Sequence, residues 1–181
     1  LSLAPLSLAP CALRPEASFS RVRVAQNLPA GMGSLSLLPN KDGGVIDDCI
    51  VTNAGDHLYM VINAGHEDKD LPHLASHLAE FVKSGKDASM ETLPHNGLVA
   101  VQGPKAAEVL QRMVEPGVVL SEMKFMAAAT MTVNGAECFV TRSGYTGEDG
   151  FEIGELHMHT RLLDSRATVS CSPNPLLPLL T

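Results

Sequence analysis

The chain has 181 residues, 45% of them hydrophobic, and a formal net charge of −7. This length corresponds to one domain, and the apolar fraction is ample for a hydrophobic core. Nucleic acid and anionic membranes attract basic surfaces, so we expect no nucleic-acid partner and no membrane partner for this acidic chain. The sequence also contains no apolar run that approaches the length needed to cross a bilayer.

Residues 1–28 begin with a direct repeat of Leu-Ser-Leu-Ala-Pro and carry three arginines against a single acid, Glu16. That composition is similar to a mitochondrial presequence. The prolines at positions 5, 10 and 15 would nevertheless break an amphipathic helix, and the first residue is not Met. We therefore expect residues 1–28 to be a disordered or non-native extension.

The stretch 43–51 opens with two glycines and continues with β-branched residues, which predicts a strand entered from a tight turn. Asp47 and Asp48 are adjacent in this apolar run, and neighbouring residues of a strand point to opposite faces. One carboxylate is therefore expected in a protected space, where it needs a cation or hydrogen-bond donors. The alternative is that one aspartate is solvated while the other caps a turn or pairs with an arginine.

Short alternating segments on both sides of this stretch, 34–38 and 57–63, predict further strands. Residues 57–63 follow a turn and are expected to pair antiparallel with the acidic strand. If the register of that hairpin is simple, Tyr59 lies near the acidic pair.

Apolar residues at helical spacing predict an amphipathic helix with Pro72 near its start and Gly85 just past its end. Lys69 and His73 would lie on its outer face. His73 and His77 have the spacing of metal ligands, but no third ligand follows at a recognisable spacing, so we expect a solvated face and no metal site. The four cysteines are scattered without a CxxC pair, which indicates buried structural thiols in a reducing compartment.

The second half of the chain predicts a weak strand at 89–93, a buried strand at 97–102 and a short helix after Gly103-Pro104. Residues 126–133 and 136–141 are joined by Asn-Gly, the preferred two-residue type I′ turn. These elements indicate an α+β domain with a mostly antiparallel sheet and two amphipathic helices on one face.

A glycine-rich loop follows this hairpin and leads to Glu152, a carboxylate between Phe151 and Ile153 at the start of an apolar strand. Glycines let such a backbone bend sharply and approach a ligand closely. We expect the other polar residues of the loop to shape it rather than to react; these are Arg142, Tyr145 and Glu148.

Four blocks occur in order along the chain: GGVIDDCIVTN, HLYMVINAGHEDKDL, LVAVQGPKAAEVLQ and GYTGEDGFEI. In sequence and spacing they resemble the aminomethyltransferase (T-protein) of the glycine cleavage system, from about residue 28 to residue 153. The resemblance implies an incomplete folate-binding domain of the T-protein type at 29–153. It does not extend to the family's first segment or its β-barrel domain. The divergent tail, 154–181, is expected to be disordered.

The resemblance implies a mitochondrial matrix enzyme of glycine catabolism and one-carbon metabolism. Such an enzyme transfers a one-carbon unit from the aminomethyl-lipoyl H-protein to tetrahydrofolate and releases ammonia. The implied partners are the lipoyl-bearing H-protein and tetrahydrofolate, which is a substrate, and no metal is implied. Two alternatives stay open: a folate-binding module without transferase activity, and an inactive truncated isoform.

Five positions match the family's site. Asp48 matches the essential aspartate, with Asp47 as the adjacent alternative; a fixed carboxylate there would stabilise the cationic iminium through which the carbon passes. Glu152 matches the position that accepts two hydrogen bonds from the pterin ring. Tyr59 and Asn63 match positions that line the folate pocket.

Overall fold

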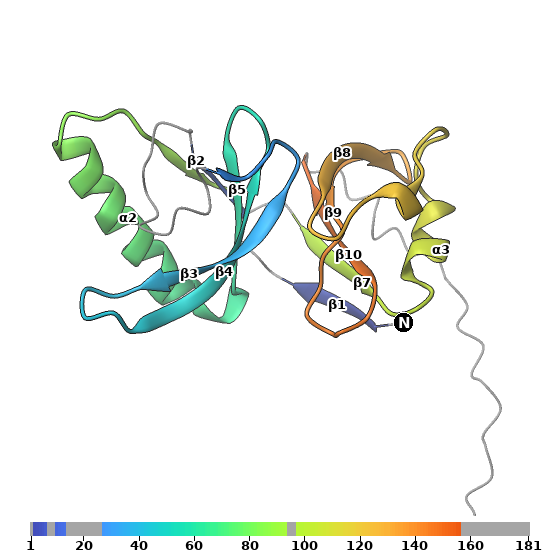
Figure 1. Ribbon diagram of the computed structural model, residues 1–181, viewed down its shortest axis with the longest axis horizontal. Coiled ribbons are helices and arrows are strands. Elements are labelled where there is room, and N and C mark those ends of the chain that lie inside the picture. Colours follow the sequence, from blue (N-terminus) through green and yellow to red (C-terminus); the bar gives the residue numbers. More distant parts are fainter. Residues whose placement is uncertain (1, 7–9, 14–26, 94–96, 157–181) are drawn as a thin grey trace, which may run out of the picture.

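The computed structural model of the chain describes residues 2–6, 10–13, 27–93 and 97–156 (Figure 1). Within these residues, ten strands form two five-stranded sheets, and every strand pairing is antiparallel. The α+β class and the antiparallel pairing are confirmed. The expectation of a single sheet with both helices on one face is wrong, because each helix packs on a sheet of its own.

The first sheet has the strand order β3-β4-β5-β2-β6. The bounds are β2 Pro10–Leu13, β3 Gly33–Pro39, β4 Val45–Asn53, β5 Leu58–Ile62 and β6 Met90–Thr92. After β5, the 3-10 helix η1, Ala64–His66, leads into helix α2, Glu67–Lys83. Helix α2 covers one face of this sheet, and the core between them consists of Leu38, Cys49, Val51, Leu58, Met60, Ile62 and Leu74.

The second sheet has the strand order β1-β7-β10-β9-β8. The bounds are β1 Ser2–Leu6, β7 Leu98–Gln102, β8 Ala128–Val133, β9 Ala136–Thr141 and β10 Gly150–Glu155. Helix α3, Ala106–Gln111, and the 3-10 helix η2, Leu120–Glu122, cover it. Its core includes Ala106 and Leu110 from α3 and Phe151 and Ile153 from β10.

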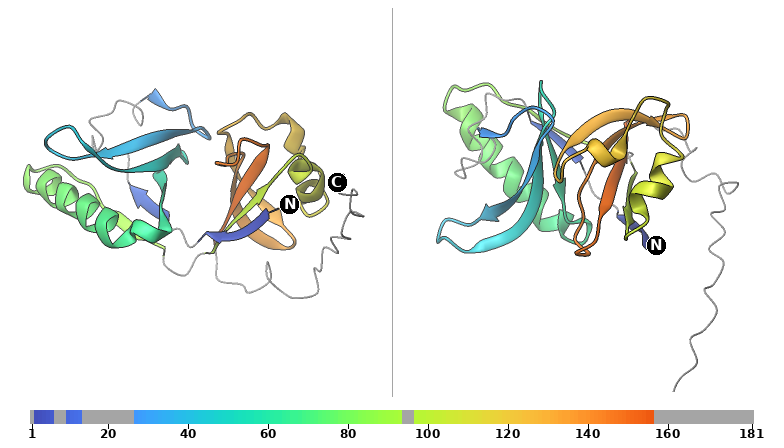
Figure 2. Two further views of the ribbon diagram at one scale, coloured as in Figure 1. Left: turned by 90° about the horizontal axis from the view of Figure 1, so that it is seen from below. Right: turned by 45° about the vertical axis from the view of Figure 1, so that its right-hand side comes forward.

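The two sheets lie side by side, with α2 on the outer side of one and α3 on the outer side of the other (Figures 1 and 2). A third buried cluster joins their inner faces through Tyr59, Ala128 and Phe139. The ring centroids of Tyr59 and Phe139 are 4.7 Å apart, and the two rings are tilted relative to each other, which is a favourable geometry for an aromatic pair. Side chains on both inner faces can therefore contribute to one site.

Strands β8 and β9 form a hairpin, which confirms the type I′ turn predicted from Asn134-Gly135. Asn134 and Gly135 have φ values of 50° and 82°, and a type I′ turn requires positive φ at both central positions. The buried thiols are confirmed for Cys49 and Cys138, which are free and buried; the structure does not describe the side chains of Cys11 and Cys171.

Helix α2 begins at Glu67, earlier than the predicted start, so Pro72 lies inside the helix. The exposed acids Glu67 and Asp68 lie in the first turn, where carboxylates interact favourably with the helix dipole and extend the helix in the N-terminal direction. The apolar spacing from which the helix was predicted does not include this polar turn.

Strands β1 and β2 lie within the segment 1–28, for which disorder was expected. They add to β7 and β5 through backbone pairing, which requires no particular side-chain pattern. Strand β10 also ends at Glu155, two residues beyond the expected domain boundary. The division into 1–28, 29–153 and 154–181 stays a prediction, and residues 157–181 lie outside the described part of the chain.

Candidate functional site

The two aspartates of β4 face opposite sides of their sheet. Asp47 pairs with Leu38 and alternates with the core residues Cys49 and Val51, so it points toward α2. Asp48 points to the other face, and it is exposed. The sequence predicted that one carboxylate would be protected but could not assign it. The structure assigns the protected position to Asp47.

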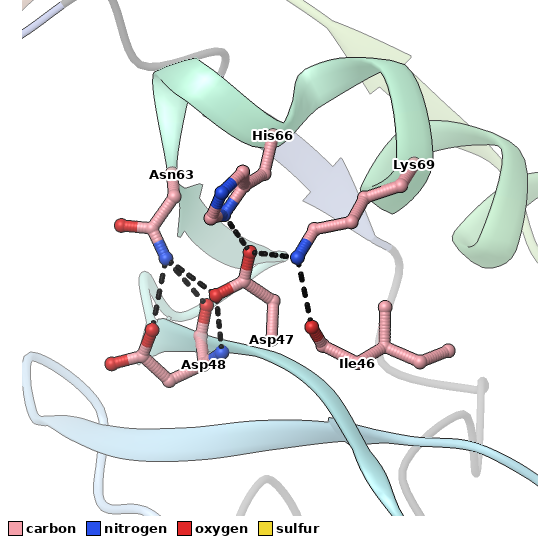
Figure 3. A network of polar contacts seen from close by, with 6 residues as sticks. All are labelled: Ile46, Asp47, Asp48, Asn63, His66 and Lys69. Atoms are coloured by element: carbon pink, nitrogen blue, oxygen red, sulfur yellow. Dashed lines mark hydrogen bonds and ion pairs between the residues drawn. The ribbon is translucent and has the colours of Figure 1, made fainter.

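Four donors converge on the carboxylate of Asp47 (Figure 3). Oδ1 accepts the backbone N–H of Asp48 at 2.9 Å and the side-chain amide of Asn63 at 2.8 Å. Oδ2 lies against Nδ1 of His66 and 3.0 Å from Nζ of Lys69. Lys69 also donates to the backbone carbonyl of Ile46 at 2.9 Å, which fixes its ammonium group over the strand.

These donors determine the charge of Asp47. Burial alone would raise the pKa of this carboxyl group, whose side chain is 9% exposed. The hydrogen bonds from Lys69, the Asp48 N–H, Asn63 and His66 outweigh burial and hold the pKa far below its ordinary value. Asp47 is therefore an anion at all physiological pH values.

Asn63 connects Asp47 to Asp48. Its amide nitrogen donates to Oδ1 of each aspartate at 2.8 Å, which brings the two carboxyl groups, on opposite faces of the strand, to one side chain (Figure 3). On the open face, Leu37 is paired with Asp48 and is 44% exposed. The Asp48 carboxylate thus lies on an accessible surface with an apolar flank.

Tyr59 lies away from the acidic pair, so the expectation that it adjoins the pair is wrong. The register of β4 and β5 places Tyr59 opposite Thr52, four residues along the strand from Asp48. Tyr59 instead reaches the other sheet, where a Cβ atom built on Gly154 would lie 2.7 Å from its hydroxyl oxygen. Only a residue without a side chain fits β10 at this point.

Glu152 lies near Tyr59 on the inner face of β10, because its neighbours Phe151 and Ile153 point into the core under α3. It is 8% exposed. Burial raises the pKa of Glu152, and the nearby hydroxyl group of Ser143 offsets part of that effect. Burial, reinforced by the negative charge of Glu152, also raises the pKa of the Tyr59 phenol far above its ordinary value.

The glycine-rich loop before β10 is fixed at two points. Arg142 forms a bidentate ion pair with Asp149, at 2.9 Å for each hydrogen bond, and donates to the Met123 carbonyl at 2.6 Å. Gln102 lies beneath the loop and donates to the Ser143 carbonyl at 3.0 Å. Arg142 thus has the shaping role that the sequence suggested, while Tyr145 is 67% exposed and Glu148 is also exposed.

Asp47, Asp48 and Asn63 are in direct contact, and Tyr59 and Glu152 form a second group on the facing strands. Sequence reasoning missed His66 and Asp70, and it assigned Lys69 to the solvent side of the helix. These three residues follow β5 directly at positions i, i+3 and i+4, which place them on one helix face. That spacing, read together with the acidic strand, is the signal that would have found them.

No group of three potential metal ligands occurs within residues 27–93 and 97–156. His73 and His77 stack edge to face with ring centroids 4.6 Å apart, and both are half-buried rather than fully solvated. Burial lowers the pKa of His73, and the neighbouring His77 lowers it further. Of the helices in the described residues, none has the length and apolar character needed to span a membrane.

Comparison with known proteins places this chain in a family. The sequence profile of the GCVT N-terminal domain matches residues 19–163. The chain belongs to the aminomethyltransferase (T-protein) family of the glycine cleavage system. Relatives named mitochondrial aminomethyltransferase include those of Dictyostelium discoideum, 48% identical over 139 residues, and Homo sapiens, 43% identical over 158 residues.

Family membership extends to the fold. The chain matches the glycine cleavage system aminomethyltransferase T of Bartonella henselae with a TM-score of 0.66 and 31% identity, over 84% of this chain and 41% of that one. A chain of the heterotetrameric sarcosine oxidase of Corynebacterium, 18% identical with a TM-score of 0.53, shares the fold alone. The matched part is 75% of this chain but 34% of the Dictyostelium relative, and 79% of this chain but 38% of the human one.

Proposed function

We propose that the chain is the folate-binding part of a mitochondrial matrix aminomethyltransferase. It would transfer the one-carbon unit of the aminomethyl-lipoyl H-protein to tetrahydrofolate and release ammonia. One observation carries the proposal beyond family membership. An exposed Asp48, held by Asn63, shares the inner face of its sheet with Tyr59, and Tyr59 contacts the strand that carries Glu152.

The reaction has a requirement that Asp48 meets. The carbon atom loses its bonds to the amino nitrogen and the lipoyl sulfur and gains bonds to two folate nitrogens. The two protons of those folate nitrogens leave with ammonia and the dihydrolipoyl thiol. A cationic iminium forms between these steps, and a fixed carboxylate nearby lowers its free energy without reorganising. Because Asn63 holds its Oδ1, Asp48 can take this role from an accessible surface.

Glu152 and Tyr59 would bind the pterin ring. The ring presents an N–H and an amino group side by side, and one carboxylate can accept both. Burial without enough donors raises the pKa of Glu152 in the unliganded protein. A ligand that supplies two donors would therefore favour the ionised form. Tetrahydrofolate is a substrate in this scheme, and no metal takes part.

The test is a thermal melt of the 181-residue chain with and without tetrahydrofolate, followed by an ammonia-release assay with aminomethyl-loaded H-protein. A ligand that binds only the native state raises the melting temperature. We expect such a shift and measurable ammonia release. A shift without release would identify a folate-binding module without transferase activity. The lack of a cooperative transition would identify an inactive truncated form.

A further inference from the structure

Asp70, in the first turn of α2, is a completely buried acid next to His66 and Lys69, and its own role in the site has not been assigned above. Its relative exposure is 0%, and neither carboxyl oxygen has a hydrogen-bond partner within the described residues. An ionised carboxylate in such a position would be strongly unfavourable, because it has lost water and gained no donor in exchange. The ionised form of Asp70 does not fit this environment.

Asp70 follows Lys69 directly and lies one helical turn after His66, and both of these residues contact Asp47, so the two acids are neighbours. Two ionised carboxylates only accept hydrogen bonds, so a bond between them requires that one carries a proton. Their environments decide which one. Asp47 receives four donors, whereas Asp70 receives none, so the proton belongs on Asp70. Burial raises the pKa of Asp70, and the negative charge of Asp47 raises it further.

We propose that Asp70 is protonated at neutral pH and donates its O–H to the carboxylate of Asp47. Asp70 is then a positioning residue. It fixes Asp47 from the helix side, Asp47 holds the amide of Asn63, and Asn63 holds Asp48 on the open face. The catalytic value of holding Asp48 in place rests on the aminomethyl transfer proposed above. The protonation of Asp70 does not depend on that proposal.

The protonation of Asp70 determines whether the stability of the fold rises or falls with pH. The titratable groups around Asp70 are Asp47 and Cys49 on β4, His66 on η1 and Lys69 on α2. A carboxyl group whose pKa is raised by folding holds its proton longer in the folded state than in the unfolded state. Its contribution to stability is therefore present at low pH and declines as the pH rises from the ordinary value of 3.8 to the raised value.

The first experiment looks for the proton directly. The infrared carbonyl band of a protonated carboxyl group is measured at neutral pH in the wild-type chain and in Asp70→Asn. Asn is isosteric with the neutral acid and keeps a donor toward Asp47. We expect the band in the wild type and a loss of intensity in Asp70→Asn. The control Asp68→Asn, in the same turn but exposed, should keep the full band. Because burial also raises the pKa of Glu152, the same comparison is made in a Glu152→Gln background, which removes any contribution of that acid. A wild-type spectrum without the band, or a band of unchanged intensity in Asp70→Asn, would overturn the proposal.

The second experiment tests positioning. Asp70→Asn should keep ammonia release close to wild type, whereas Asp70→Ala, which lacks the donor, should lose about a hundredfold in turnover through misplacement of Asp48. The decline of stability with rising pH should also be smaller in Asp70→Asn than in the wild type and unchanged in Asp68→Asn; the raised pKa of Glu152 accounts for a decline that remains in Asp70→Asn. Equal turnover in Asp70→Ala and Asp70→Asn, or an unchanged pH profile in Asp70→Asn, would contradict positioning. If the wild type releases no ammonia, the transfer proposal fails while the infrared band and the stability profile still decide the state of Asp70.

Discussion

Asp47 and Glu152 both have carboxyl groups with little exposure to solvent, yet their electrostatic states are opposite. The side chain of Asp47 is 9% exposed, and Glu152 is 8% exposed as a residue. Folding lowers the pKa of Asp47 and raises that of Glu152, although burial is the largest influence on both. The number of donors that surround each carboxylate explains the difference. Burial of an acid therefore does not by itself predict its charge.

The source of the donors also differs. The donors of Asp47 come from β4 itself, the end of β5, η1 and α2, which meet at one corner of the first sheet. Glu152 is paired with Ala100 and Thr141 in the middle of the second sheet, whose backbone groups bond to one another. Asp47 is thus satisfied by the protein, whereas Glu152 keeps acceptor capacity for a ligand. Asp48, exposed beside Asp47, combines a fixed position with access.

The largest effect should come from Asp48. Replacing it with Ala should reduce turnover with H-protein about a thousandfold and leave most of the tetrahydrofolate affinity, because the carboxylate acts on the cationic intermediate. Turnover and folate affinity are measured in parallel, with Asp42→Ala in the exposed turn before β4 as control. Unchanged turnover in Asp48→Ala would remove its electrostatic role.

Asp47→Asn tests whether the hydrogen-bond donors around Asp47 stabilise its charged form. In the wild type, the ionised Asp47 carboxylate contributes fully to the free energy of unfolding above the ordinary pKa of 3.8. This contribution is lost as the pH falls toward the lower pKa that Asp47 has in the folded state. At neutral pH, we expect the variant to lose about 2 kcal/mol of unfolding free energy, because hydrogen bonds to a charged group are lost. The loss should shrink below pH 3.8 in chemical denaturation curves. A difference independent of pH would show that the charge of Asp47 is not what stabilises the fold.

Glu152→Gln tests whether Glu152, which has few hydrogen-bond donors around it in the protein, accepts hydrogen bonds from the folate. One acceptor oxygen becomes a donor, so tetrahydrofolate affinity should fall about tenfold. Wild-type affinity relative to the variant should rise with pH through the raised pKa of Glu152 and then level off, because binding needs the ionised carboxylate. Calorimetric titration at several pH values measures both effects, with exposed Glu148→Gln as control. Equal affinities for Glu152→Gln and wild type would exclude Glu152 from the pterin site.

The smallest effect is expected from Tyr59→Phe. The ring contact with Phe139 is kept and only the hydroxyl is lost, so folate affinity should fall about fivefold with little change in melting temperature. Tyr145→Phe, at a residue that is 67% exposed, is the control and should bind folate as the wild type does. A larger loss of folate affinity in Tyr145→Phe than in Tyr59→Phe would indicate that folate binds at the glycine-rich loop and not at Tyr59.

The sequence by itself determined the local features of this protein. Asn134-Gly135 determined a type I′ hairpin, and the β-branched run around Asp47 and Asp48 determined a strand with one carboxylate on each face. The apolar spacing after Leu71 determined the body of α2. These patterns depend on residues only a few positions apart, so the chain carries them wherever its elements are packed.

Only the tertiary structure decided which aspartate meets the helix, where Tyr59 lies, and that Asp70 is buried. The side chains of Asn63, His66 and Lys69 reach β4 across 15 to 23 residues of sequence. Such contacts exist because α2 packs on one face of the sheet and brings its first turn over the start of β4. Alternation along a strand fixes two faces but does not say which one a helix will cover, and that choice assigns the charge of each acid.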